Sequence, residues 1–422
     1  LQSMSLPSSV TEVGSYAFYG CSNMASITLS NLTKISDYAF RGCSSLDGIV
    51  LPETLTEIGN YAFSGCVGLS GITIPNTVTR ISQYAFSGCT GITELTLSNG
   101  LQTIGQEAFK NMQLQSIVVP NSVTSIGVGA FQGCPFESIT LPFVGKSRDA
   151  SAYEAVFGYV FGYATQSSGT SGAYSGNMVV SESFIDKRQG SVSGTTWQYS
   201  KVSYRLNSSW YDVTSYFYYI PSTLTNVVIT DATVIPEEAF YNCEDIISVT
   251  LNNEIKTIGT NAFKNCTKLE SADIGTGVTA INADAFKNCS ALKSMVLPSS
   301  VTEVGSYAFY GCSNMASITL SNLTKINDYT FYGCSSLTGI TLPETLAEIG
   351  EYAFYGSGLE GATIPNTVTS IGSYAFGDVV GITELALPNG LLTIGDKAFS
   401  NVQIKTIVVP NSVTSIGGGA FQ

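Results

Sequence analysis

The sequence predicts a right-handed solenoid of stacked coils, with a parallel sheet on the concave side and short 3₁₀ or irregular segments on the convex side. The main evidence is an Ala-Phe dipeptide that returns every 22 or 23 residues within two blocks of the chain. A single unit of this length cannot bury its own apolar side chains, whereas stacked units bury them against one another in a continuous core. The repeat phenylalanines are Phe18, Phe40, Phe63, Phe86, Phe109, Phe131, Phe240, Phe263, Phe286, Phe309, Phe331, Phe354, Phe376, Phe399 and Phe421.

Each unit also contains one short strand. In residues 51–75, LPETLTEIGNYAFSGCVGLSGITIP, the apolar residues Leu69, Ile72 and Ile74 are separated by polar or small residues. This spacing is typical of a short, half-buried strand. Pro75 follows directly, and proline ends strand pairing because it has no backbone N–H to donate. The rest of the unit shows no long helical pattern, so the fold is dominated by β structure.

The consensus of the units, approximately LPxxVTxIGxYAFxGCxxLxxITLP, carries a family resemblance. It is similar to the BspA-like class of leucine-rich repeats, which share the IGxxAFxGC signature, over about residues 1–142 and 220–422. The resemblance implies a leucine-rich-repeat solenoid of the α/β class. It also implies a secreted or cell-surface protein of host-associated bacteria that acts as an adhesin or binding scaffold. The implied partners are host extracellular-matrix or plasma proteins, or other cells.

The repeat divides the chain into three segments. We expect about six coils in residues 1–142, an aromatic-rich insert in 143–219 that continues the solenoid irregularly with projecting loops or a hairpin, and about nine coils in 220–422. Residues 6–21 return as residues 297–312, and near-identity continues to Gln132 and Gln422. Both ends of the chain resemble repeat interiors. We therefore expect a piece of a longer protein, whose other parts hold the secretion signal, the polar caps and any anchor.

The insert contains one group of candidate binding residues. It lacks the Ala-Phe period, holds both tryptophans, and is enriched in tyrosine and in basic side chains within an acidic chain. These aromatic residues either pack a wider coil or form a binding patch, because Tyr, Trp and Arg dominate interface hot spots. Stacking of a tryptophan on a sugar ring is one form of such a patch. The candidates are Tyr159, Tyr163, Trp197, Arg205, Trp210 and Tyr211.

The outward positions of the strands form the second candidate surface. Residues at alternate strand positions share one face of a sheet, and here they form two columns of hydroxyl-bearing or small residues. Such a surface suits the extended docking of a protein or a glycan, although isolated hydroxyls are also ordinary strand formers. We take Glu94, Thr96, Ser317 and Thr319 as representative binding candidates.

Cysteine and tyrosine each recur at a fixed place in the unit. All ten cysteines lie three residues after a repeat Phe, a position that also holds Met112, Ser357, Val379 and Val402. A position that accepts Met and Val is a small apolar core slot, so we favour a column of free thiols over disulfides. Tyrosine often stands two residues before the Phe, where other units have Glu, Asn, Asp, Lys or Gly. This tolerance predicts a partly exposed tyrosine ridge, used either for packing or for adhesion.

Composition excludes several classes of function. The chain has 422 residues, a formal net charge of −13 and no histidine. The acidic balance argues against nucleic acid as a partner, and the absence of histidine excludes Ser-His-Asp and Cys-His catalysis and His-ligated zinc. No apolar run is long enough to span a bilayer in this segment. Together with these exclusions, the family resemblance implies an extracellular, non-enzymatic binding scaffold without metal or cofactor. A structural spacer that displays another domain, and glycan binding through the aromatic insert, are the alternatives.

Overall fold

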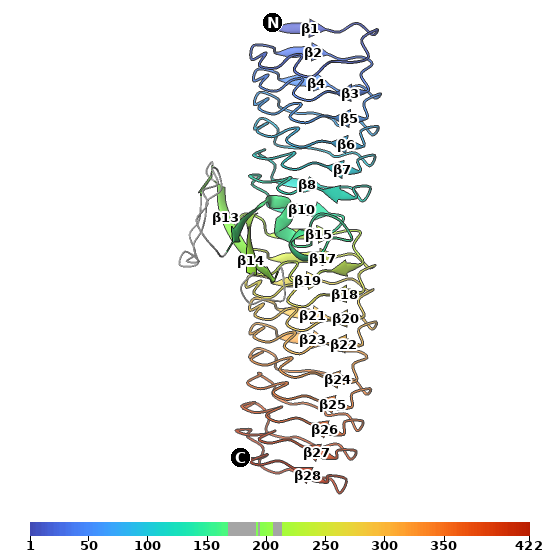
Figure 1. The fold of residues 1–422 in the computed structure, drawn as a ribbon. Helices are drawn as coiled ribbons and strands as arrows, with labels where there is room; N and C mark the ends of the chain where they lie inside the picture. The colour runs from blue at the N-terminus through green and yellow to red at the C-terminus, as the bar shows by residue number, and fades with distance from the viewer. Residues whose placement is uncertain (168–190, 193–194, 206–212) are drawn as a thin grey trace. The chain divides into compact units, whose positions relative to one another are not determined.

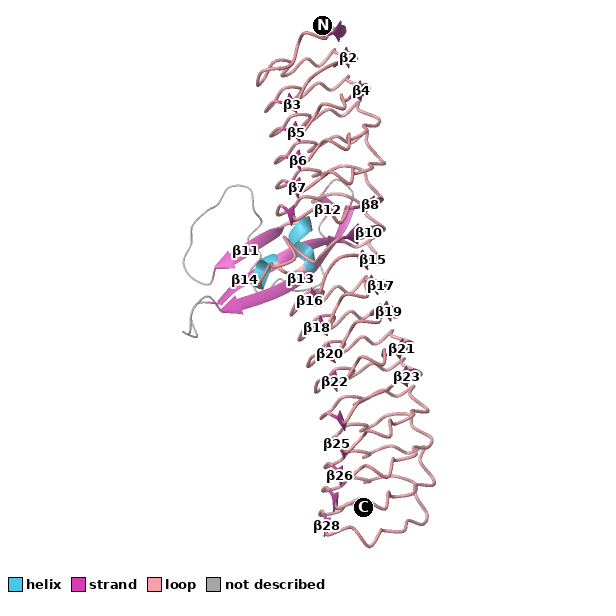
Figure 2. Ribbon diagram, turned by 90° about the vertical axis from the view of Figure 1, so that its right-hand side faces the viewer, coloured by secondary structure: helices cyan, strands magenta, loops and turns pink. Residues whose placement is uncertain are grey.

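The computed structural model describes residues 1–167, 191–192, 195–205 and 213–422. The chain forms two compact units, Leu1–Asp231 and Ala232–Gln422. In each unit the chain winds into stacked coils, and short strands of successive coils pair in parallel (Figures 1 and 2). This arrangement confirms the predicted solenoid of the leucine-rich-repeat type.

The first ladder of the first unit consists of the predicted strands. Ser3 pairs with Ser26 and Ser26 with Gly48, so the register advances by one coil at each step. Along β2, Ile27 is buried between the exposed Ser26 and Thr28, as the alternation predicted. This ladder contains β1 (Ser3–Ser5), β2 (Ser26–Thr28) and β4 (Gly48–Val50), and then β8 (Ser116–Val118), β10 (Ser138–Leu141) and β15 (Asn226–Ile229).

A second parallel ladder runs along the same coils. Its strands are only two residues long. In the first unit each of them ends on a buried Ile that precedes the repeat Gly or its substitute. These strands were not expected from the sequence, because two residues are too few to show an alternating pattern. In the first unit this ladder consists of β3 (Lys34–Ile35), β5 (Glu57–Ile58), β6 (Arg80–Ile81), β7 (Thr103–Ile104) and β9 (Ser125–Ile126).

The turn that follows the second ladder places the aromatic core. The Ala-Phe phenylalanines stack on one another with ring centroids 4.9 to 5.9 Å apart within the two units. The residues two before and two after each Phe adopt the left-handed backbone region, for example Tyr61 at φ 54° and Gly65 at φ 76° around Phe63. Asparagine replaces glycine at the second of these positions in several coils, for example at Asn265, and it tolerates this region better than most residues do.

The insert leaves the stack and returns to it within one coil step. β10 pairs directly with β15, and Ser138 lies opposite Asn226. The helix η2 (Phe157–Phe161) covers the preceding turn, because the Phe131 N–H donates to the Val160 carbonyl at 2.9 Å. It follows η1 (Ala152–Glu154). An antiparallel sheet then stands out from the coils (Figure 2). It consists of β11 (Tyr163–Ser167), β14 (Val213–Pro221), β13 (Thr195–Arg205) and β12 (Ser191–Val192).

The second unit repeats both ladders. Its first ladder contains β17 (Ser248–Leu251), β19 (Ser271–Asp273), β21 (Ser294–Val296) and β23 (Ser317–Thr319). Its second ladder contains β16 (Val234–Ile235), β18 (Thr257–Ile258), β20 (Ala280–Ile281), β22 (Glu303–Val304), β24 (Lys325–Ile326), β25 (Glu348–Ile349), β26 (Ser370–Ile371), β27 (Thr393–Ile394) and β28 (Ser415–Ile416). The division of the chain at residues 142 and 219 stays a prediction.

Candidate binding surfaces

Most residues in the outward columns of the first ladder are exposed in both units, whereas Ser138, Thr140 and Ser248 are half-buried. On β23, Ser317 and Thr319 are exposed on either side of the buried Ile318. Glu94 and Thr96 are exposed at the equivalent positions of a coil in the first unit. The pleat of the strand therefore turns these four predicted side chains away from the core. Whether they contact a partner stays a prediction.

Four valines make part of this face apolar. They are 63 to 83% exposed, although valine is usually buried. Each lies at the second outward position, where most coils have threonine, so apolar side chains are interspersed among hydroxyls along the column. These valines are Val50, Val118, Val296 and Val408.

The predicted tyrosine ridge is present as two continuous stacks. Tyr16, Tyr38, Tyr61 and Tyr84 stack in the first unit, with centroids 4.5 to 4.8 Å apart. The guanidinium of Arg41 lies over two of these rings, 5.6 Å from the Tyr38 centroid and 5.3 Å from that of Tyr61. Because the faces of most rings meet other rings, the stack presents ring edges and hydroxyls to solvent.

The second unit has a wider version of the ridge. Tyr307, Tyr329, Tyr352 and Tyr374 stack at 4.5 to 4.7 Å, and Tyr310, Tyr332 and Tyr355 form a parallel stack beside them at 4.7 and 5.0 Å. Lys287 lies over the first ring of both stacks, 4.5 Å from the Tyr307 centroid and 4.9 Å from that of Tyr310. At the other end, the Tyr355 hydroxyl donates to Asp378, and this bond raises the pKa of Tyr355 to about 12. These contacts favour a packing role for the ridge.

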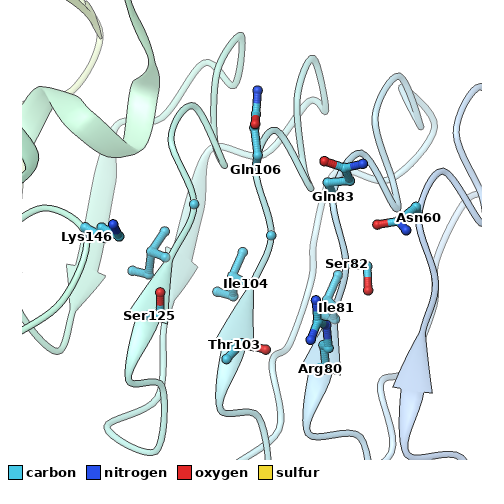
Figure 3. Close-up of a pocket in the computed structure, with 13 residues that line it drawn as sticks. Asn60, Arg80, Ile81, Ser82, Gln83, Thr103, Ile104, Gln106, Ser125 and Lys146 are labelled. Carbon is cyan, nitrogen blue, oxygen red and sulfur yellow. The ribbon is translucent and has the colours of Figure 1, made fainter.

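A shallow polar trough lies over β6, β7 and β9 in the first unit. Its volume is about 510 Å³. It crosses the second ladder, which was not expected from the sequence. Three amide side chains from successive coils, Asn60, Gln83 and Gln106, form a row along it (Figure 3). Two cations line it, Arg80 and Lys146, of which Lys146 is paired with Glu154 at 2.8 Å, and the isoleucines beneath are buried.

A second trough of about 510 Å³ lies over β25 to β28 in the second unit. It covers the equivalent coils of the duplicated sequence and one coil more, from which Lys325 and Asp328 come, and its chemistry is different. Four carboxylates line it, together with one cation, and that cation is paired, since Lys325 Nζ lies 2.8 Å from Glu348 Oε1. The carboxylates are those of Asp328, Glu348, Glu351 and Asp396.

The aromatic candidates of the insert are placed only in part. Tyr159 lies in η2 and is 6% exposed, so its ring is not offered to a partner on the surface. The backbone of Tyr163 belongs to β11, and the backbones of Trp197 and Arg205 belong to β13. Trp210 and Tyr211 lie outside the described residues. The binding role of these residues stays a prediction.

The cysteine column consists of free thiols. Cys66 donates its thiol to the Phe40 carbonyl of the preceding coil at 3.1 Å, and the same bond recurs in seven other coils at 3.1 to 3.2 Å. Burial raises the pKa of Cys43 to about 11 and that of Cys134 to about 12. Such thiols are poor nucleophiles because the reactive thiolate is suppressed. In the described part of the chain, no group of three or more Cys, Asp or Glu side chains is placed to hold a metal ion.

Stacked coils with two parallel ladders and a repeated aromatic turn define a leucine-rich-repeat scaffold. The family model of the BspA type leucine rich repeat region matches residues 1–93, 84–155, 212–323 and 305–422. The chain therefore belongs to the family of BspA type leucine-rich-repeat proteins. The comparison with curated proteins gave no match.

Several solved structures have similar chains. A leucine-rich repeat protein from Bacteroides ovatus is 23% identical, with a TM-score of 0.49, over 97% of this chain and 88% of the other. A leucine rich cell surface protein from Faecalibacterium prausnitzii is 22% identical, with a TM-score of 0.33, over 81% and 87%. An internalin from Listeria monocytogenes is 10% identical, with a TM-score of 0.30, over 92% and 86%. Among the residues that the structure describes, no helix is both long and apolar enough to cross a membrane.

Proposed function

We propose that this protein is a non-enzymatic adhesin or binding scaffold on the surface of a bacterium, or secreted from it, that engages host extracellular-matrix or plasma proteins or other cells. The observation that carries this proposal is the exposed face of the first ladder. Its hydroxyl, small and valine side chains repeat coil after coil. A rigid face of this kind offers a partner many modest contacts, and their sum rather than one deep pocket gives affinity.

Two further features support a binding role rather than catalysis. The cysteine thiols have raised pKa values, and each bonded thiol donates to a backbone carbonyl, so the cysteine column is a core element. The two troughs are shallow, and their lining residues combine amides, hydroxyls and charges without a histidine. Families with this fold act mainly through the surfaces that the coils present.

The proposal is tested with immobilised matrix proteins, plasma proteins and mucin. The double variant Ser317→Arg and Thr319→Arg places two long cations on the exposed face of β23. We expect it to weaken binding by about tenfold or more, which corresponds to about 1.4 kcal/mol. Val380→Arg is the matched control, because Val380 is 63% exposed and lies outside both columns.

The outcomes separate the candidate functions. Loss of binding in the double variant but not in the control supports the first ladder as the binding face. Equal binding by the unmodified protein, the double variant and the control would indicate that the partner contacts another surface. If the unmodified protein binds none of these partners, the scaffold serves as a spacer and the proposal is wrong.

A further inference from the structure

We propose that the trough over β6, β7 and β9 binds an anionic polysaccharide. This inference rests on the proposed binding function and names one class of partner for it. The trough is built from a row of amides, two cations and hydroxyls, and carboxylates are absent from its lining residues, all of which are described. Its chemistry therefore differs from that of the chain as a whole, which carries a net charge of −13.

The amide row gives the trough a repeat that matches a polymer. Asn60, Gln83 and Gln106 occupy the same position in three successive coils (Figure 3), and successive parallel strands lie about 4.8 Å apart. An amide can both donate and accept hydrogen bonds, which suits the hydroxyl groups of a sugar. Asn60 Nδ2 donates to Asp37 at 3.0 Å and Gln106 Nε2 to Glu107 at 3.3 Å, so these two amides are oriented by the chain and have further donor and acceptor capacity for a sugar. Thr103 and Ser125 add hydroxyls along the same trough. An extended chain of sugars can meet equivalent groups at each coil.

The cations give the trough a preference for acidic sugars. Arg80 is 62% exposed at its side chain and lies 4.0 Å from Glu57, at the edge of ion-pair range. Its guanidinium therefore remains accessible to a carboxylate or sulfate, and it can bind such a group with two parallel hydrogen bonds. Lys146 contributes a second positive charge from the start of the insert, and its Nζ lies 2.8 Å from Glu154.

The duplicated copy provides an internal comparison. The segments TVTRISQYAF at 77–86 and TVTSIGSYAF at 367–376 differ at three positions, and two of these replace Arg80 and Gln83 by serine. Asn60 is replaced by Glu351, and Gln106 by Asp396. All four replacements line the equivalent trough, and two of them, Glu351 and Asp396, add carboxylates that the first copy lacks. The other two carboxylates of the second trough, Asp328 and Glu348, have counterparts in Asp37 and Glu57 of the first copy, outside the lining of the first trough. The two copies thus differ in charge at the amide row itself, which indicates that their troughs bind different ligands.

The lining also argues against other polymers. None of its residues is aromatic, and its isoleucines are buried, so neither a neutral sugar that stacks on a ring nor an apolar peptide finds a partner there. Nucleic acid presents one phosphate charge about every 1.7 Å of duplex and needs many more cations than two. Amides and hydroxyls with sparse positive charge suit a polymer whose acidic groups are separated by neutral hydroxyls.

The test uses the full chain with heparin, hyaluronan and neutral dextran as probes, measured by surface plasmon resonance at two salt concentrations. We expect the unmodified protein to bind at least one of the two anionic polymers, more weakly at high salt because screening reduces charge contacts, and not to bind dextran. Comparison of heparin with hyaluronan distinguishes recognition of sulfate from recognition of carboxylate.

The decisive variant is Asn60→Glu, Arg80→Ser, Gln83→Ser and Gln106→Asp. Each new side chain already occupies the equivalent position of the second copy, so the coils accept it. We expect binding to fall by about tenfold or more. The control variant Glu351→Asn, Ser370→Arg, Ser373→Gln and Asp396→Gln changes the second trough in the opposite sense. It leaves the first trough intact, so its binding is expected to match or exceed that of the unmodified protein.

Two results would overturn this inference. One is that the unmodified protein binds neither anionic polymer, and the other is that the decisive variant binds as well as the unmodified protein. Either result leaves the proposed function standing if the protein still binds matrix or plasma proteins through β23. If the protein binds an anionic polymer but no matrix or plasma protein, the result would instead count against the proposed function.

Discussion

The cysteine column predicts that Ser357→Cys stabilises the protein. Ser357 takes the place of cysteine in its coil and is 5% exposed, and its Oγ is buried without a hydrogen-bond partner. The equivalent residue of the first copy is Cys66, which is fully buried and donates its thiol to the Phe40 carbonyl at 3.1 Å. Replacing the hydroxyl by a thiol restores the group that the slot accommodates in most coils.

The magnitude follows from the two groups. A buried polar group without a partner costs about 1–3 kcal/mol, whereas a buried cysteine behaves as a small apolar side chain with a weak donor. We expect Ser357→Cys to raise the local free energy of unfolding by about 1–2 kcal/mol. Cys66→Ser should lower it by a similar amount in the other copy, because the change is the same with the opposite sign.

Hydrogen exchange is the appropriate assay. A long repeat array need not unfold in one step, so a single midpoint does not report on one coil. Exchange of the Phe354 and Ser357 amides, measured by mass spectrometry under reducing conditions, reports on the altered coil itself. Slower exchange in Ser357→Cys and faster exchange around residue 66 in Cys66→Ser are the expected results.

A third variant separates the two contributions. Ser357→Val removes the hydroxyl without supplying a thiol, and Val379 shows that the slot holds valine, since it is fully buried there. Protection in Ser357→Val close to that in Ser357→Cys would assign the gain to removal of the hydroxyl. If neither variant protects the coil and Cys66→Ser leaves its own coil unchanged, the reasoning about the unpaired hydroxyl is refuted.

Three further predictions follow from the core and the turns. Phe263→Ala removes a fully buried ring from between Phe240 and Phe286. It should lower the local free energy of unfolding by about 3–5 kcal/mol, measured as faster amide exchange confined to neighbouring coils. Uniform loss of protection along the chain would contradict nearest-neighbour coupling between coils. Burial raises the pKa of Cys43 to about 11 and that of Cys134 to about 12, so the unfolded state loses these thiol protons at lower pH than the folded state does. The free energy of unfolding should therefore fall as pH rises above about 9. A thermal unfolding midpoint that stays constant from pH 8 to 11 would contradict this prediction. Gly65 has a left-handed backbone with φ 76°, so Gly65→Ala should lower the free energy of unfolding by about 1 kcal/mol, measured by thermal or chemical unfolding. Gly65→Asn should lower it by less, because asparagine tolerates this region better. Equal losses for the two variants would show that the left-handed backbone is not the cause.

The first ladder and the core were predictable because their signals recur in every unit. The positions of Phe63 and Cys66 follow from the period alone, since a column that accepts only apolar or small residues must face the interior. The second ladder was not predictable from one unit, because the two residues of a strand such as β7 carry no alternation. The left-handed backbone at Tyr61 was also missed, because tyrosine rarely adopts it. The Asn, Asp and Gly residues at the same position of other coils were the available indication.

The candidate troughs were missed for a different reason. Asn60, Gln83 and Gln106 are 23 residues apart in the sequence, and they form a row only after the coils are stacked. A comparison of the two near-identical copies would have shown that these positions change together. In contrast, the exposed strand columns were predicted, because the alternation in Ser26–Thr28 already distinguishes the inner residue from the outer ones.

The pairing of β10 with β15 has a consequence for how this architecture acquires new parts. The Thr225 N–H donates to the Glu137 carbonyl at 3.0 Å, so the coil that follows the insert pairs directly with the coil that precedes it. The entropy of closing such an excursion grows only with the logarithm of its length, by about 0.6 kcal/mol for each doubling. The two ends of an insert at this junction are therefore held in fixed positions by β10 and β15, and the entropy cost of closing the insert depends only weakly on its length. We expect that an insert of another length or sequence can replace residues 143–219 while the pairing of the coils on either side is kept.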